Sequence, residues 1–174
     1  MTLSTSGLAP QIERMAEEPW QVNLAVSLHA PTNALRDQLV PINQTYPLER
    51  LLAAVQTYSE RTHRRVTFEY VLLAGVNDDL EQARDLAALL RGMLCHVNLI
   101  PLNPEPSGRF SAPRRERIAQ FQRVIEAVGI ACTVRIDRGQ DIAAACGQLA
   151  RQRRGAQEEF RQREPVARQA SRAR

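Results

Sequence analysis

Residues 66–101 read VTFEYVLLAGVNDDLEQARDLAALLRGMLCHVNLIP, and the fold class follows from their pattern. Residues 66–73 are a run of β-branched, aromatic and aliphatic residues, which predicts a strand. Residues 80–90 repeat apolar side chains at a spacing near 3.6, which predicts a helix that begins after the capping residues Asn77-Asp78. Residues 96–101 form a second strand-like run. A strand, a helix and another strand in this order are typical of a parallel α/β sheet.

The same alternation extends in both directions from this stretch. Three further strand-like runs lie at residues 2–5, 22–28 and 131–136, and the first of them would begin upstream of the chain. Two further helices are expected, one with its apolar face at residues 48–58 and one that follows residues 111–113. Gly129 should end the second of these helices, because glycine adopts the left-handed conformation that commonly follows a helix.

Polar residues directly follow three of the apolar runs. These segments are Ser4–Gly7, Ser27–Ala30 and Pro101–Pro104. In parallel α/β folds the carboxyl ends of the strands form the ligand site. Each segment taken alone reads as an ordinary turn, but three such strand ends on one rim favour a binding site.

Length and composition are those of one soluble globular domain. The chain has 174 residues, of which 44% are hydrophobic and 24% charged. No apolar run approaches the roughly 18–20 residues that span a membrane, and residues 1–7 lack the basic and hydrophobic parts of a secretory signal. The three cysteines lack metal-ligand spacing such as CxxC. An odd number of cysteines argues against a disulfide framework and favours the reducing cytoplasm as the compartment.

Basic charge is concentrated toward the C-terminus, and every basic residue is arginine. Residues 1–110 hold 9 Arg against 12 Asp and Glu, whereas residues 111–174 hold 14 Arg against 7. This asymmetry fits either nucleic-acid binding or a solvated tail. We expect one folded region over residues 1–150. Residues 151–174, with almost nothing to bury, should be a basic tail that is disordered or a frayed helix.

The most specific motif in the chain is RGQDIAAACGQL at residues 138–149. Five other motifs precede it: LSTSG at 3–7, SLHAP at 27–31, VPIN at 40–43, EYVL with VND within 69–78, and NLIPLNP at 98–104. Together and in this order they resemble the RlmN and Cfr family of radical S-adenosylmethionine RNA methyltransferases. The resemblance covers residues 2–150.

The resemblance implies a fold and a set of site residues. The fold would be the C-terminal portion of an incomplete (β/α)6 TIM-like radical S-adenosylmethionine barrel, to which this chain supplies the later strands. Cys146 would be the cysteine that carries a methyl group during the reaction. No residue would bind a metal. The residues expected to bind S-adenosylmethionine are Ser4, Ser27, Leu28, His29 and Asn103.

The sequence neighbours of the three cysteines predict different roles for them. Cys146 lies among Ala and Gly, which leave its sulfur uncrowded, and a nearby Arg138-Gly139 turn would favour a reactive thiolate. A small buried residue in an Ala-rich helix is the alternative at that position, and without the family pattern it is the favoured one. Cys95 and Cys132 lie on or beside apolar strands, so we expect both to be buried.

The resemblance also implies a reaction. In the family, S-adenosylmethionine methylates the cysteine, and radical chemistry that depends on a 4Fe-4S cluster then transfers the carbon to carbon 2 of an adenine. The implied substrates are 23S ribosomal RNA and tRNA. Specificity for a different carbon of the same adenine, as in Cfr, is not distinguished by these motifs.

Several family features are expected upstream of the first residue. They are the cluster-binding CxxxCxxC, the resolving cysteine, the Gly-Glu motif and the N-terminal RNA-binding domain. Three scattered cysteines do not supply the cage of thiolates that such a cluster needs. We therefore expect no radical chemistry from this chain alone. The alternative function is a non-catalytic half-barrel module that binds RNA or a partner through its arginine-rich C-terminal end.

Overall fold

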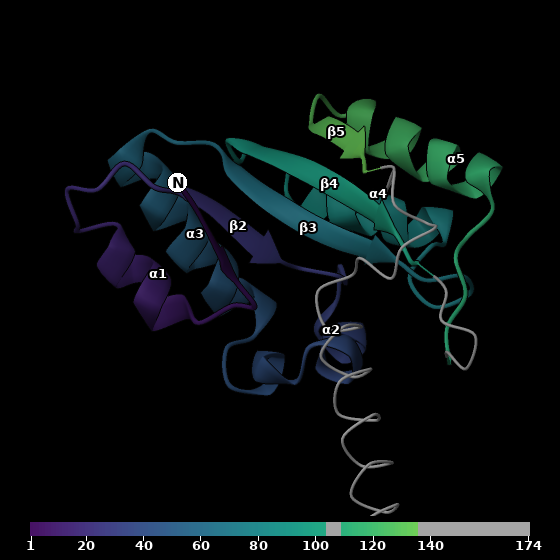
Figure 1. The fold of residues 1–174 in the computed structure, drawn as a ribbon, viewed down its shortest axis with the longest axis horizontal. Helices are drawn as coiled ribbons and strands as arrows, with labels where there is room; N and C mark the ends of the chain where they lie inside the picture. The colour runs from purple at the N-terminus through teal and green to yellow at the C-terminus, as the bar shows by residue number, and fades with distance from the viewer. Residues whose placement is uncertain (104–108, 136–174) are drawn as a thin grey trace, which may run out of the picture. The chain divides into compact units, whose positions relative to one another are not determined.

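The computed structural model describes residues 1–103 and 109–135, which belong to one compact unit. Five strands are present in the described residues: β1 (Thr2–Thr5), β2 (Asn23–Ser27), β3 (Val66–Leu72), β4 (Cys95–Pro101) and β5 (Ala131–Val134). The helices there are α1 (Ala9–Met15), α2 (Asn33–Leu39), the short 3-10 helix η1 (Pro41–Gln44), α3 (Leu48–Thr62), α4 (Leu80–Leu89) and α5 (Arg115–Glu126) (Figure 1).

The strands form one parallel sheet in the order β1-β2-β3-β4-β5, which is also their order in the chain (Figure 1). Right-handed crossovers between consecutive neighbours place the connecting helices on a single face of such a sheet. Burial along β3 agrees, because Val66, Phe68, Tyr70 and Leu72 are buried whereas the residues between them are half-buried. The predicted parallel α/β fold is confirmed. The described sheet is open and does not close into a barrel.

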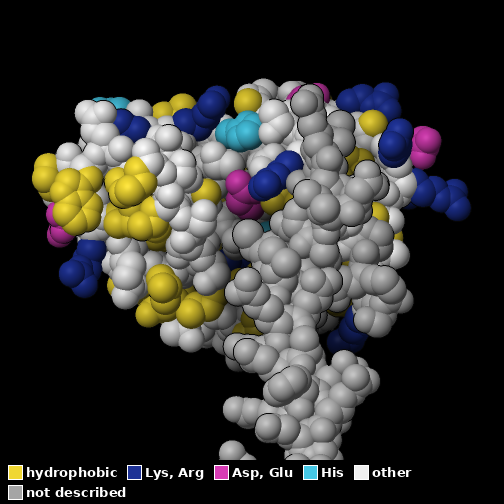
Figure 2. All heavy atoms as spheres, in the orientation of Figure 1, with side chains coloured by type: hydrophobic (Ala, Val, Ile, Leu, Met, Phe, Trp, Pro, Cys, Tyr) yellow, Lys and Arg dark blue, Asp and Glu magenta, His cyan; other side chains and the backbone are white. Residues whose placement is uncertain are grey.

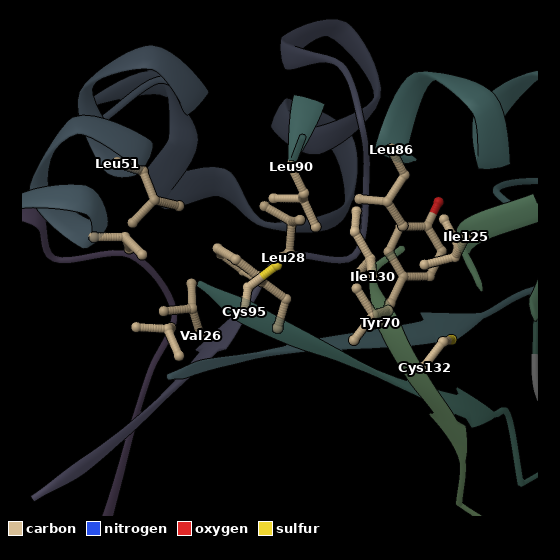
Figure 3. Close-up of a cluster of buried hydrophobic side chains, with 14 of the residues drawn as sticks. Val26, Leu28, Leu51, Tyr70, Leu86, Leu90, Cys95, Ile125, Ile130 and Cys132 are labelled. Carbon is tan, nitrogen blue, oxygen red and sulfur yellow. The ribbon is translucent and has the colours of Figure 1, made fainter. Parts of the chain in front are cut away.

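The core lies between the sheet and the helices that cover it. Val26 of β2, Leu28 just after it and Leu51 of α3 meet there, as do the side chains of α4 (Figure 3). Tyr70 of β3 lies against Phe121 of α5, with their ring centroids 5.4 Å apart. Each large apolar side chain buried in this way contributes about 1.5–3 kcal/mol.

Cys95 and Cys132 are part of this apolar core, each with 7% of its surface exposed. Burial raises the pKa of the Cys95 thiol to about 11 and that of the Cys132 thiol to about 12. Both thiols therefore stay protonated near neutral pH, and the expectation that these two cysteines are buried side chains is confirmed.

The start of α4 differs from the prediction. Asp79, not Asn77-Asp78, caps this helix: its side chain accepts from the Glu81 N–H at 2.8 Å, and Gln82 completes a capping box. Asn77 is fully buried and bonds to strand ends instead. The helices α1, α2 and η1 were not predicted, because seven residues or fewer hold too little of a 3.6-residue repeat to show one.

Two of the expectations fall where the structure gives no description. Cys146 with its motif and the basic tail at 151–174 lie outside the described residues. No helix among residues 1–103 and 109–135 is long and apolar enough to cross a membrane.

Candidate functional site at the carboxyl ends of the strands

Arg36 of α2 joins the carboxyl ends of β1 and β2. Its side chain is fully buried. Nη2 donates to the carbonyl oxygens of Ser6 at 2.7 Å and Ser27 at 3.0 Å, and Nε donates to that of Leu28 at 3.0 Å. Three backbone carbonyls that no helix or ladder satisfies thus receive their hydrogen bonds from one guanidinium group. This arrangement fixes the two strand ends relative to each other.

The Arg36 charge is buried beside neutral acceptors. Its Nη1 donates to Asn43 Oδ1 at 3.0 Å, and the Asn43 amide in turn donates to Asp37 Oδ1 at 2.7 Å and Asn33 Oδ1 at 3.0 Å. Burial lowers the pKa of Arg36 to about 10, although nearby Asp37 acts in the opposite direction. The guanidinium therefore remains charged at neutral pH, and it places positive potential at the strand ends.

Gly7 is required where β1 turns away from this arginine. Its φ is +123°, a conformation that L side chains rarely adopt. A Cβ atom at this position would also lie 3.1 Å from Arg36 Nη2. Glycine is therefore the residue that lets the chain pass the buried guanidinium.

His29 turns the chain at the end of β2. Its φ of +60° is left-handed, and its Nδ1 accepts a hydrogen bond from the Val71 N–H at 3.1 Å. Burial, together with the positive charge of Arg36, lowers the pKa of His29 to about 4. The ring is therefore neutral near pH 7. Because Nδ1 accepts, the proton lies on Nε2, which makes that nitrogen a hydrogen-bond donor.

Asn77 connects the ends of β2 and β3. Its Nδ2 donates to the carbonyl oxygens of His29 at 2.9 Å and Val71 at 2.7 Å, and its Oδ1 accepts from the Leu73 N–H at 2.7 Å. The Tyr70 hydroxyl donates to the Asn77 carbonyl at 2.9 Å. All the polar atoms of the Asn77 side chain are thus used to hold these two strand ends in place.

Three of the five residues predicted to bind cofactor lie at the carboxyl ends of β2 and β4, the two strands that flank β3. His29 bonds to Val71 on one side, and the Leu102 N–H donates to the Leu72 carbonyl at 3.2 Å on the other, which places Asn103 just beyond the end of β4. Ser27 pairs in register with Glu69 of β3, on the sheet face that the helices leave open. The carboxyl ends of β2 and β4 therefore carry a hydroxyl, an imidazole and a carboxamide on the two sides of β3.

Ser4 and Leu28, the other two predicted residues, differ in placement. Ser4 pairs with Ala25, so it lies on the open face and one row further from the strand ends than Ser27. The Leu28 side chain is fully buried in the core. Only its backbone is placed to meet a ligand, and its N–H already donates to the Glu69 carbonyl at 3.0 Å.

A row of hydrogen-bonded polar side chains crosses the open face next to Ser27. Asn98 Nδ2 donates to Glu69 Oε2 at 2.9 Å, and the Thr133 hydroxyl donates to Asn98 Oδ1 at 3.1 Å. The same hydroxyl lies 3.0 Å from His96 Nε2, from which it accepts because its one proton is already donated. The row holds the Glu69 carboxylate in one orientation beside Ser27.

Comparison with known proteins shows which family the chain resembles. A protein of Desulforudis audaxviator described as "Probable dual-specificity RNA methyltransferase RlmN" is 54% identical over 88% of this chain. A protein of Caldanaerobacter subterraneus with the same description is 54% identical over 87% of the chain. A crystal structure of a radical SAM methyltransferase from Sphaerobacter thermophilus is 60% identical, with a TM-score of 0.82 over 84% of the chain. The chain belongs to the RlmN family.

The match covers part of each relative. The chain spans 48% and 44% of the two RlmN proteins and 43% of the Sphaerobacter chain, so it corresponds to about half of their length. A domain of a pyruvate-formate lyase-activating enzyme from Bacteroides vulgatus has a TM-score of 0.62 at 18% identity, which shows a shared fold. No family model matches the chain.

Arg36 and Asn77 organise the strand ends of this RlmN-family chain, and sequence reasoning did not give either of them this role. For Arg36 the available signal was its place between two motifs, SLHAP and VPIN, the second of which contains its partner Asn43. For Asn77 the signal was the VND motif, which was interpreted as a helix start.

A groove lies at the opposite, amino ends of β3 and β4. It has a volume of about 370 Å³ and is lined by residues of α3 with His63, and by Arg91, Gly92, Met93 and Leu94. Ligands of parallel α/β folds bind at the carboxyl ends of the strands. The carboxyl ends of this RlmN-family sheet are therefore favoured as the binding site over this groove. Among the described residues, no group of three or more His, Cys, Asp or Glu is arranged to hold a metal ion.

Proposed function

We propose that this chain forms part of a cytoplasmic RlmN-type methyltransferase that methylates carbon 2 of adenine in 23S ribosomal RNA and tRNA. The identity to RlmN proteins supports the reaction class. The observation that carries the proposal is that Ser27, His29 and Asn103 lie at the carboxyl ends of β2 and β4, the two strands that flank β3. The alternative of a non-catalytic module is not favoured by these comparisons.

The strand-end residues fit S-adenosylmethionine by their chemistry. When bound, this molecule supplies a methyl group to a nucleophile and, with a reduced cluster, radical chemistry. Ser27 offers a hydroxyl that donates and accepts, Asn103 offers an amide, and His29 offers a donor at Nε2. These groups suit a carboxylate, ribose hydroxyls and an adenine edge. Ser4 and the Leu28 backbone complete the proposed pocket on the side of β1 and β2.

Cys146 is the proposed methyl carrier. Its thiolate would act as the nucleophile that accepts a methyl group, and its sulfur would then hold that carbon next to the adenine. Cys95 and Cys132 are unsuited to this role, since both are buried and their pKa values are raised.

The residues described do not fit the 4Fe-4S cluster. A cluster needs three or four thiolates in one cage, and the two described cysteines are both buried in the apolar core with protonated thiols. We propose that its ligands lie in the part of the relatives that this chain does not span.

The test uses the chain extended to the full length of its relatives. Cys146→Ala should abolish adenine methylation while S-adenosylmethionine binding is kept, and Cys95→Ala, the matched control, should keep methylation. Mass spectrometry should find a methyl group on the peptide that contains Cys146 and none on Cys95 or Cys132. Full methyl transfer by Cys146→Ala would disprove the assigned route.

A further inference from the structure

Four arginines are concentrated just before and within the first turn of α5. Arg109, Arg114, Arg115 and Arg117 lie within nine residues, and Glu116 is the one acid among positions 109–117. The first three are exposed and Arg117 is half-buried. The ion pairs within the described part of the chain involve Arg50 and Arg61, so none of these four is neutralised there. Figure 2 shows basic side chains over α5.

An exposed aromatic ring accompanies this charge. Phe110 is 36% exposed, and the Arg109 guanidinium carbon lies 5.6 Å from the centroid of its ring. Aromatic rings on a basic surface stack unpaired bases, and each stacked base is worth about 1–3 kcal/mol. A part-exposed ring beside Arg109, in a segment that carries three further arginines within seven residues, therefore suits a partner with both bases and phosphates.

The backbone places this segment at the same end of the sheet as the candidate site. The Ala74 N–H donates to the Ser111 carbonyl at 2.9 Å, and the Leu102 N–H donates to the Leu72 carbonyl at 3.2 Å. Leu72 is the last residue of β3, and Ala74 follows it by two residues. The segment that carries the arginines and the segment that carries Asn103 are thus attached to the same strand end.

We propose that Arg109, Phe110, Arg114, Arg115 and Arg117, here called the basic rim, bind the phosphates and an unpaired base of the substrate RNA. The proposal rests on the proposed function for the identity of the RNA, and it adds the surface that holds this RNA beside the strand ends. Exposed arginines contact phosphates and release counterions, so binding should weaken as salt rises. Phe110 should favour a single-stranded loop over a continuous duplex.

Two double variants of equal charge test the basic rim. Arg114→Glu/Arg115→Glu reverses two rim residues, and Arg84→Glu/Arg91→Glu reverses two exposed arginines elsewhere. Binding of the full chain to a fluorescent RNA hairpin is measured by anisotropy over a range of salt concentrations. The rim variant should bind about tenfold or more weakly, and the slope of log affinity against log salt concentration should fall in magnitude by about 2. The control variant should lose less than about threefold in affinity. Equal losses in the two variants would mean that net charge alone acts, and would overturn the proposal.

Two further measurements identify the partner. Phe110→Ala should weaken binding to the hairpin loop by at least about fivefold and leave binding to a blunt duplex unchanged. Vesicles of anionic lipid serve as the competing anion, and rim-dependent binding to vesicles without binding to RNA would also overturn the proposal. Cofactor binding and Cys146 methylation are measured separately on the extended chain. The proposal for the basic rim can therefore be disproved while the proposed function stands, and the proposed function can be disproved while the rim still binds RNA.

Discussion

Fully buried side chains lie both at the carboxyl ends of β1–β3 and in the core beneath β3–β5, but opposite interactions hold them. At the strand ends, Arg36 and Asn77 are fully buried and bond to five backbone carbonyls and one N–H. In the core, Phe121 and Leu86 are equally buried and contact apolar neighbours. Apolar contacts tolerate exchange for residues of similar volume, whereas a buried charge tolerates neither loss of its partners nor a change of shape. The strand ends are thus the more specifically determined region.

The largest expected effect is at Arg36. Arg36→Met keeps much of the volume but leaves the Ser6, Ser27 and Leu28 carbonyls without their donor. Each unsatisfied buried group costs about 1–3 kcal/mol, so the free energy of unfolding should fall by about 3–5 kcal/mol. Phe121→Leu, the matched change in the core, should cost about 1–2 kcal/mol. Urea denaturation measures both variants. Equal losses of unfolding free energy in the two variants would show that the strand ends are no more sensitive to substitution than the core.

Asn77 should have the next largest effect. Asn77→Ala removes two donated bonds and one accepted bond between buried groups, so it should cost about 2–3 kcal/mol. Asn98→Ala, which removes two side-chain bonds on the open face, should cost about 1 kcal/mol or less, because water reaches the groups it leaves behind. Thermal or urea unfolding compares the pair, and a larger loss for Asn98→Ala would contradict this interpretation.

His29 should make stability depend on pH. Its pKa is lowered in the folded state to about 4 from an ordinary value of 6.5, so below pH 6.5 the unfolded chain binds a proton that the folded chain does not. Stability should therefore fall as pH drops from about 6.5 to about 4, by about 2 kcal/mol after allowance for partial exposure. In His29→Asn, which tolerates the left-handed turn, that part of the pH dependence should disappear. An unchanged pH profile would show that the imidazole is not held neutral.

These polar contacts are also where sequence reasoning stopped short. The strands predicted at 66–73 and 96–101 and the helix predicted at 80–90 match β3, β4 and α4 to within a residue, because their apolar repeats are local. Arg36 was missed because its acceptors lie as far as 30 residues away in the chain, and a charged residue ordinarily predicts a surface. Asn77 was misassigned because asparagine also caps helices. Ser27, His29 and Asn103 came from family motifs, since single polar residues after a strand look like turns.

The smallest expected effect concerns the β1 edge of the sheet. In the described residues β1 pairs with one strand, β2, and Leu3 is 39% exposed. An unpaired strand edge favours association, so sedimentation velocity should show self-association that rises with concentration. Co-expression of the remaining half of a relative should reduce it, and so should Leu3→Lys. A monomer that melts sharply at high concentration would count against this expectation.

The most direct test of the account is where S-adenosylmethionine binds on this chain. Titration of the isotope-labelled protein, followed by backbone amide chemical shifts, reports each region separately. Shifts should be largest at Ser27–Ala30 and Asn103, at the carboxyl ends of the strands, and they should be lost in Arg36→Lys, which keeps the charge but not the planar fork of donors. Shifts confined to His63 and Arg91–Leu94, at the groove on the amino ends, would contradict the account, as would no shift at millimolar ligand.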